Sequence, residues 1–196
     1  MPFLTGPVTD ERDAHVTFLT QQLDQLRICA LGLDDDQLRT APIASSLSLA
    51  GLFAHVAQTV AQYLQGVYEN GVDQSSLNLS PESFTLELNA FYSGAEIPEG
   101  WTGDQIRLCL QQATDLVQPV LGAADFEARV PIPEAPWFPQ DLESWNIRWI
   151  AHHLSTEVAR HVGHADVIRE AIDGEIAYSL NARDEGQEFK WADYEL

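Results

Sequence analysis

Basic residues are scarce in this sequence. The chain has 10 lysines and arginines against 30 acidic residues, which gives a formal net charge of −20 at pH 7. A surface of this charge repels phosphate backbones and anionic lipid headgroups. We therefore expect neither a nucleic-acid partner nor a membrane partner. The same charge favours solubility and makes cations the natural counterions.

Long hydrophobic runs and secretion signals are also missing. No stretch reaches the roughly 18 apolar residues that a membrane-spanning helix requires. The first residues, MPFLTGPVTDERDAH, contain neither the basic region nor the apolar core of a signal peptide, so a cytoplasmic location is expected. The two cysteines, Cys29 and Cys109, form no CxxC pair and lie in apolar segments. We expect both to be buried thiols outside any disulfide framework.

Helical periodicity is the main feature that the sequence does have. Its 196 residues are 45% hydrophobic, enough for one domain with a sizeable core. Apolar residues recur at helical spacing in four long segments, 9–32, 48–70, 103–124 and 144–172, and a short helical turn is expected near 34–40. No convincing pair of strands accompanies them. This pattern predicts an all-α four-helix bundle with long inter-helix loops.

The segments between these helices are harder to interpret. Residues 71–100 have little periodicity and are expected to form a loop with one helical turn, whereas the four prolines in 123–143 indicate an ordered loop. Pro119 is expected to kink or shorten the third helix. We place the bundle domain at 1–174 and a tail at 175–196, which is expected to dock through its aromatic side chains, Tyr178, Phe189, Trp191 and Tyr194.

The fourth helix carries most of the histidines. Four of the chain's six histidines lie in HHLSTEVARHVGH, residues 152–164. With about 100° per residue, the side chains of this stretch separate by direction. His161 falls within the apolar arc, Glu157 at its border, His153 and His164 just outside it, and His152 on the polar side. We expect His153 and His164 to line a pocket, support the site or lie at the surface, and His15 and His152 to be surface residues.

Glu157 and His161 lie one helical turn apart and point toward the bundle interior. Removing a carboxylate from water costs several kcal/mol unless a cation or several donors meet it. A divalent ion would satisfy both groups, and His55, at the edge of the buried face of the second helix, is the candidate for a third ligand. Three protein ligands leave coordination positions open, as catalytic metal sites do.

Two interpretations without a metal stay open at this point. A histidine beside an apolar face is more often a satisfied core residue than a ligand. Glu157 could likewise pair with Arg160 at the surface, a contact of little energetic value. The three residues would then form a polar network without an ion.

Two motifs resemble a known superfamily. AHVAQTVAQYL at 54–64 and RWIAHHLSTEVARHVGHADVIREAIDG at 148–174 resemble the DinB-like metal-binding four-helix bundles. The similarity is greatest to the actinobacterial branch that includes mycothiol-dependent maleylpyruvate isomerase, and it covers roughly residues 4–174. In this superfamily a histidine on the second helix joins a Glu-x-x-x-His or His-x-x-x-His pair on the last long helix. The matching residues are His55, Glu157 and His161, and the resemblance makes His164 a supporting residue.

The resemblance also implies an activity. Its characterised members use the metal to activate a low-molecular-weight thiol such as mycothiol in transferase or isomerase reactions. For this chain it implies a metal-dependent thiol S-transferase or isomerase acting on a small electrophile, with a non-catalytic metal-binding bundle as the alternative. For the enzyme, Tyr63, Trp137 and Trp149 are the residues expected to line a substrate pocket. Zinc is the first expectation for the metal, with nickel, iron or manganese as alternatives. A homodimer is expected from relatives, which are often dimeric.

Overall fold

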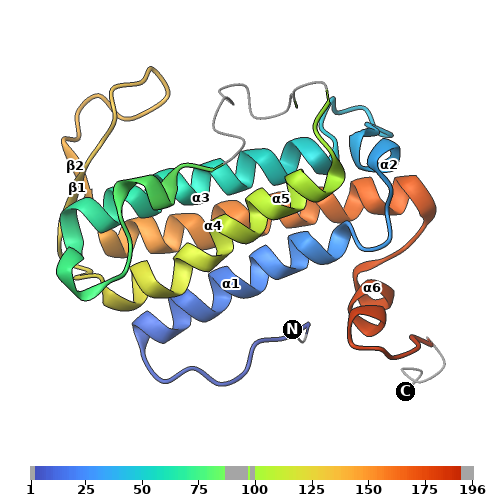
Figure 1. The fold of residues 1–196 in the computed structure, drawn as a ribbon, viewed down its shortest axis with the longest axis horizontal. Coiled ribbons are helices and arrows are strands. Elements are labelled where there is room, and N and C mark those ends of the chain that lie inside the picture. The colour runs from blue at the N-terminus through green and yellow to red at the C-terminus, as the bar shows by residue number, and fades with distance from the viewer. Residues whose placement is uncertain (1–2, 87–96, 98–99, 191–196) are drawn as a thin grey trace.

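Four long helices lie side by side in the computed structural model, which describes residues 3–86, 97 and 100–190. They are α1 (Glu11–Cys29), α3 (Leu49–Gly71), α4 (Gly103–Ala123) and α5 (Ile147–Asp173). Helix α1 packs on α4 and α5, and α3 packs on the same two helices, so each long helix has two long neighbours (Figure 1). The predicted all-α bundle is confirmed. Within the described ranges, no helix has the length and apolar character that crossing a membrane would require.

Local signals set the helix ends where the sequence indicates. Asp10 caps α1 and Ser48 caps α3, each through a side-chain oxygen that accepts a backbone N–H. Thr102 and Gln105 form a capping box at the start of α4. Gly174 ends α5 in the left-handed conformation, with φ of 79°, which glycine adopts without the steric cost of a Cβ.

Short elements fill the connections. Helix α2 (Asp35–Arg39) follows α1, and two 3₁₀ turns, η1 (Gln74–Ser76) and η2 (Pro81–Phe84), follow α3. The rest of the predicted 71–100 loop includes residues 87–96 and 98–99, which lie outside the described residues. Helix α6 (Ala177–Asp184) lies against α1.

The connection before α5 differs from its prediction. β1 (Arg129–Pro131) pairs antiparallel with β2 (Ser144–Asn146), with Val130 opposite Trp145. The predicted loop therefore contains a strand, and α5 begins three residues later than Ser144, where Asn146 caps it. Strands of three residues are too short to produce a readable alternation of apolar and polar positions. This hairpin lies at the end of the bundle opposite α2 (Figure 1).

Helix α4 continues past Pro119 to Ala123, close to the predicted end of the segment at residue 124. A proline inside a helix removes one hydrogen bond and costs about 3 kcal/mol. Val120 and Leu121, which follow it, are fully buried. Burial of such side chains contributes about 1.5–3 kcal/mol each, which offsets the cost of the proline. Of the two effects expected of Pro119, shortening of the helix is therefore wrong, and a kink stays a prediction.

Three arginines satisfy the backbone carbonyls where α1 ends. Arg169 of α5 donates to the carbonyl oxygens of Cys29 and Leu31 at 2.8 and 2.9 Å. Arg107 of α4 donates to Leu33 O at 2.8 Å, and Arg183 of α6 donates to Leu31 O at the same distance. The last carbonyls of a helix have no partner within the helix. Three of the chain's 10 basic residues thus serve to join α4, α5 and α6 to one helix end.

Both cysteines are buried free thiols, as predicted, and Cys29 contacts a carboxylate. Its Sγ donates to Asp166 Oδ1 at 3.2 Å. Burial raises the pKa of Asp166 above its usual 3.8, the charge of Glu170 raises it too, and the hydrogen bond from Cys29 only partly opposes them. The folded state consequently disfavours the ionised form of Asp166.

Replacing Asp166 by asparagine is expected to stabilise the protein at pH 7. The raised pKa makes the folded state bind this proton more tightly than the unfolded state, so the wild type loses stability as pH rises from 3.8 through the folded pKa. The amide oxygen of asparagine still accepts from Cys29. Thermal unfolding at several pH values should show an advantage at pH 7 that disappears below about pH 4. Asp115→Asn, on the exposed side of α4, is the control, and an equal gain at all pH values would contradict the prediction.

Candidate metal centre

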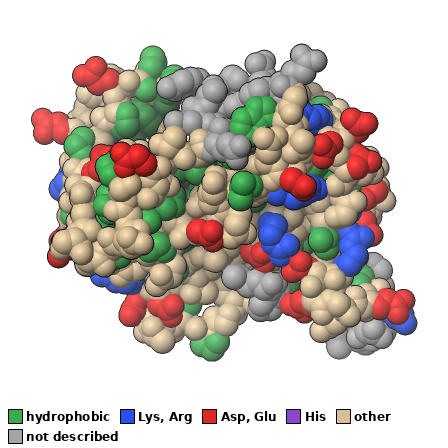
Figure 2. Space-filling view, viewed as in Figure 1, with side chains coloured by type: hydrophobic (Ala, Val, Ile, Leu, Met, Phe, Trp, Pro, Cys, Tyr) green, Lys and Arg blue, Asp and Glu red, His purple; other side chains and the backbone are tan. Residues whose placement is uncertain are grey.

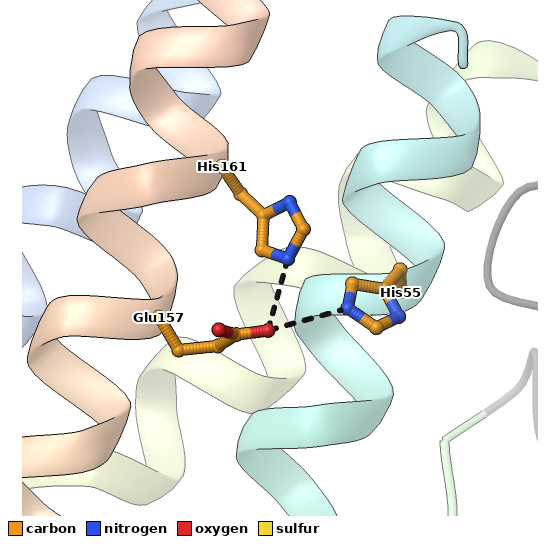
Figure 3. Close-up of side chains that lie close together, drawn as sticks. All are labelled: His55, Glu157 and His161. Carbon is orange, nitrogen blue, oxygen red and sulfur yellow. Dashed lines mark hydrogen bonds and ion pairs between the residues drawn. The ribbon is translucent and has the colours of Figure 1, made fainter. Parts of the chain in front are cut away.

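The three predicted ligands come together between α3 and α5. His55 lies in the second turn of α3, and Glu157 and His161 lie one turn apart on α5 (Figure 3). Both helices bury a continuous apolar face, and these faces pack on each other. The three polar side chains border this contact, with exposed fractions of 33% for His55, 29% for Glu157 and 19% for His161. The cluster is therefore partly buried, and each of its side chains keeps some access to solvent.

The distances within the cluster suit a single ion. Glu157 Oε1 lies 3.0 Å from His161 Nε2 and 3.7 Å from His55 Nε2. One ligand atom from each residue lies within 4.8 Å of the other two. Within the described part of the chain, this is the cluster in which three or more histidine, cysteine or acidic side chains come close enough to share an ion. Two ligands about 2.1 Å from a tetrahedral ion are roughly 3.4 Å apart. Two imidazoles and a carboxylate in this arrangement therefore fit zinc or a similar divalent ion.

The protonation states also suit metal binding. Burial lowers the pKa of His55 below 6.5, and the neighbouring His161 lowers it further, so His55 is neutral at pH 7. Burial alone would raise the pKa of Glu157. The hydrogen bond with His161 outweighs this effect, together with the positive charges that the surrounding histidines carry in the acidic range where a carboxyl group titrates. They hold the pKa of Glu157 below 4.5. The carboxylate is thus ionised, and its oxygen Oε1 contacts His161 and His55.

The other histidines separate as the helical periodicity indicates, with one exception. His153 is half-buried, stacked on Trp149 with ring centroids 4.8 Å apart, and its edge meets Tyr63 at 5.3 Å. His164 is partly exposed and His152 is exposed. The exception is His15, which was expected at the surface. It packs against Phe126 at 5.6 Å, and burial lowers its pKa.

A row of aromatic rings leads away from the cluster along α5. His153 stacks on Trp149, Trp149 stacks on Trp145 at 4.3 Å, and Trp145 meets the edge of Phe138 at 5.4 Å. Trp145, Trp149 and His153 are spaced four residues apart, which places them on one face where α5 is helical. That spacing was available in the sequence, although the predicted pocket residues were only Tyr63, Trp137 and Trp149.

The row ends at a pocket of about 680 Å³ between α3 and the β-hairpin. Tyr63 and Trp137 line it, as predicted, whereas Trp149 lies behind Trp145 and is not part of the wall. Apolar side chains gather at this end of the molecule (Figure 2). The wall consists of residues from α3, β1, the hairpin loop, β2 and α5: Gln62, Tyr63, Gln65, Gly66, Glu69, Asn70, Val130, Pro131, Pro133, Ala135, Trp137, Phe138, Trp145 and Ile150.

Comparison with known proteins agrees with the resemblance found in the motifs. A search of curated proteins gives no match. The family model for mycothiol S-transferases, in contrast, matches residues 14–174, which includes all four long helices except the start of α1. The matched range contains His55, Glu157 and His161. Because the match covers most of the chain, the chain belongs to the mycothiol S-transferase family.

Proposed function

We propose that this chain is a metal-dependent mycothiol S-transferase in which His55, Glu157 and His161 hold a divalent ion, zinc in the first instance. The observation that carries the proposal is the convergence of these three side chains, from two helices, with their ligand atoms within 4.8 Å. Membership of the mycothiol S-transferase family supports the choice of thiol and of reaction.

The charge of the cluster suits a thiolate. Two neutral imidazoles and one carboxylate carry a single negative charge, which leaves a divalent ion with one positive charge in excess. An ion held there would lower the pKa of a thiol bound to it and so supply a thiolate at neutral pH. Before an ion binds, His161 holds the Glu157 carboxylate in place through their 3.0 Å contact, and the apolar faces of α3 and α5 keep water from the inner side.

An exchangeable position is what favours catalysis over a purely structural ion. Among the described residues, the cluster has three members, while His153 is engaged with Trp149 and Tyr63. Catalytic metal sites keep such a position, whereas structural sites are closed by a fourth protein ligand. The sulfur of the co-substrate is the natural occupant.

The activity test uses a thiol and a bromomethyl electrophile. Zinc-loaded protein without an affinity tag should accelerate conjugation of mycothiol with monobromobimane at least about 100-fold over the uncatalysed reaction. The sulfur forms a bond to the bromomethyl carbon, bromide leaves with the bonding electrons, and the thiol proton passes to solvent. Fluorescence of the bimane thioether gives the rate.

Removing the metal provides the control. A chelator should return the rate to background, and zinc, nickel, iron(II) or manganese added back should identify the ion that restores it. Other low-molecular-weight thiols, such as glutathione and cysteine, test the preference for mycothiol. Protein that contains metal and accelerates no thiol in the panel would contradict the proposal and favour a non-catalytic metal-binding bundle.

A further inference from the structure

We propose that the 680 Å³ pocket binds the electrophile, and that it selects a flat, uncharged aromatic group over an anionic one. This inference rests on the proposed function and goes further by naming a second subsite and the class of compound that fills it. We refer to the fourteen wall residues given above as the aromatic pocket.

The aromatic pocket offers flat apolar surfaces from several elements. Tyr63 comes from α3, Trp137 and Phe138 from the hairpin loop, and Trp145 from β2. Trp145 lies 6.1 Å from Tyr63 and 5.4 Å from Phe138 between ring centroids, so these three rings form one wall. Trp137 is 79% exposed, although a tryptophan side chain is usually well covered. An aromatic guest would cover part of it and gain stacking energy.

Close packing of the hairpin on α3 fixes the shape of the pocket. Gly66 faces Val130 of β1, and a Cβ at this position would lie 2.9 Å from Val130 Cγ1. A Cβ here would force the Val130 side chain or the strand to shift, so the glycine allows the observed close packing. The pocket is thus held between two packed elements, as small-molecule sites usually are.

Its charge excludes anions. The described wall contains neither lysine nor arginine, and its single charged side chain is Glu69. The nearest arginine in sequence, Arg129, donates instead to Ser144 Oγ and Ser144 O. A carboxylate placed here would lose water, gain no cation and be repelled by Glu69. A neutral polar group on a bound compound would instead meet side-chain amides, because Gln62, Gln65 and Asn70 also line the pocket.

The pocket lies where it could present a substrate to the metal centre. Tyr63 follows His55 by eight residues on α3, about 12 Å along the axis. His153 touches Tyr63 and precedes Glu157 by one turn, about 6 Å. The charge of Glu157 also contributes to the raised pKa of Tyr63, after burial. A guest ring in the pocket would therefore direct its reactive carbon past Tyr63 toward the thiol.

Binding is tested first, without metal or thiol. Metal-free protein is titrated with 4-methylbenzamide and with 4-methylbenzoate, which share a shape and differ in charge, and dissociation constants are measured by ligand-observed NMR. The amide should bind at least about tenfold more tightly than the carboxylate. Trp137→Ala should weaken the amide about fivefold. Leu142→Ala, an exposed residue of the same loop outside the wall, should leave it unchanged.

A charge substitution gives a gain of binding. Glu69→Lys should tighten benzoate about tenfold by placing a cation beside it, with little change for the amide. Since Glu69 is exposed, this variant is expected to fold. Equal binding of amide and carboxylate, or amide binding that Trp137→Ala leaves unchanged, would overturn the proposal. Competition by mycothiol for the same pocket would also overturn it, because the pocket would then belong to the thiol.

Turnover links the pocket to the reaction. Mycothiol attacks the bromomethyl carbon of 4-(bromomethyl)benzamide, so that a C–S bond forms, the C–Br bond breaks and bromide leaves with the electron pair. Trp137→Ala should raise KM about fivefold at unchanged kcat. The 4-(bromomethyl)benzoate should show the higher KM. If the inert amide binds as stated but no conjugation occurs, the proposed function fails and the pocket proposal stands; if conjugation occurs with equal KM for both compounds, the pocket proposal fails alone.

Discussion

Glu157→Gln is expected to lower the affinity for a divalent ion at least about 100-fold and to return S-transfer to background. The carboxylate is the only negative charge in the cluster, so its loss leaves two neutral imidazoles to face a dication. A side-chain amide of the same shape binds such ions weakly and directs an NH₂ group toward the histidines. Elemental analysis of the purified protein, without an affinity tag, measures the metal content.

The same substitution should leave the fold intact. Glu157 is about one-third exposed, and its contacts in the cluster are with His161 and His55. Glu170→Gln, on the exposed side of the same helix, is the matched control and should retain both metal and activity. His55→Ala and His161→Ala should lose metal as well. Wild-type protein that carries no more transition metal than Glu157→Gln would contradict the metal site and leave only the hydrogen-bonded network.

The candidate site was largely predictable because it depends on helical periodicity. Glu157 and His161 are four residues apart, so forming the helix is enough to place them on one face. His55 was selected by its position at the edge of the apolar arc of α3. What periodicity alone left open is which helices are neighbours. Packing of α3 against α5 is a property of the assembled bundle, and the predicted ligands meet because of it.

Other features depend on contacts that sequence spacing does not reveal. The strands at Arg129–Pro131 and Ser144–Asn146 exist because they pair with each other across the hairpin, not because either has strong local preference. The aromatic pocket depends on this pairing, since Trp145 and Val130 are opposite one another. Arg169 falls within the apolar arc of α5, which could have marked it as buried, but its partners lie on α1 and were not predictable.

Arg169→Met is expected to destabilise the fold by about 2–4 kcal/mol, because it leaves the buried carbonyl of Cys29 without its side-chain donor and removes a charge-assisted contact with the partly exposed Asp173. Arg169 is 2% exposed, donates to Cys29 O and Leu31 O, and pairs with Asp173 through two contacts of 2.8 and 3.0 Å. Methionine fills similar space but donates no hydrogen bond. Urea unfolding and thermal unfolding give the loss of stability, and the melting temperature should fall by about 10 °C.

Arg160→Met is the matched control, because it removes the same group from the exposed side of α5 and should change stability by less than about 0.5 kcal/mol. The difference in unfolding free energy between the two variants measures how much the buried arginine at the end of α1 contributes to stability. In Arg169→Met, Leu31 O still accepts a hydrogen bond from Arg183. Cys29 O, in contrast, loses the hydrogen bond that Arg169 donates to it. A loss as small as that of Arg160→Met would mean that water satisfies these carbonyls, and that the buried arginine contributes little to joining α5 to α1.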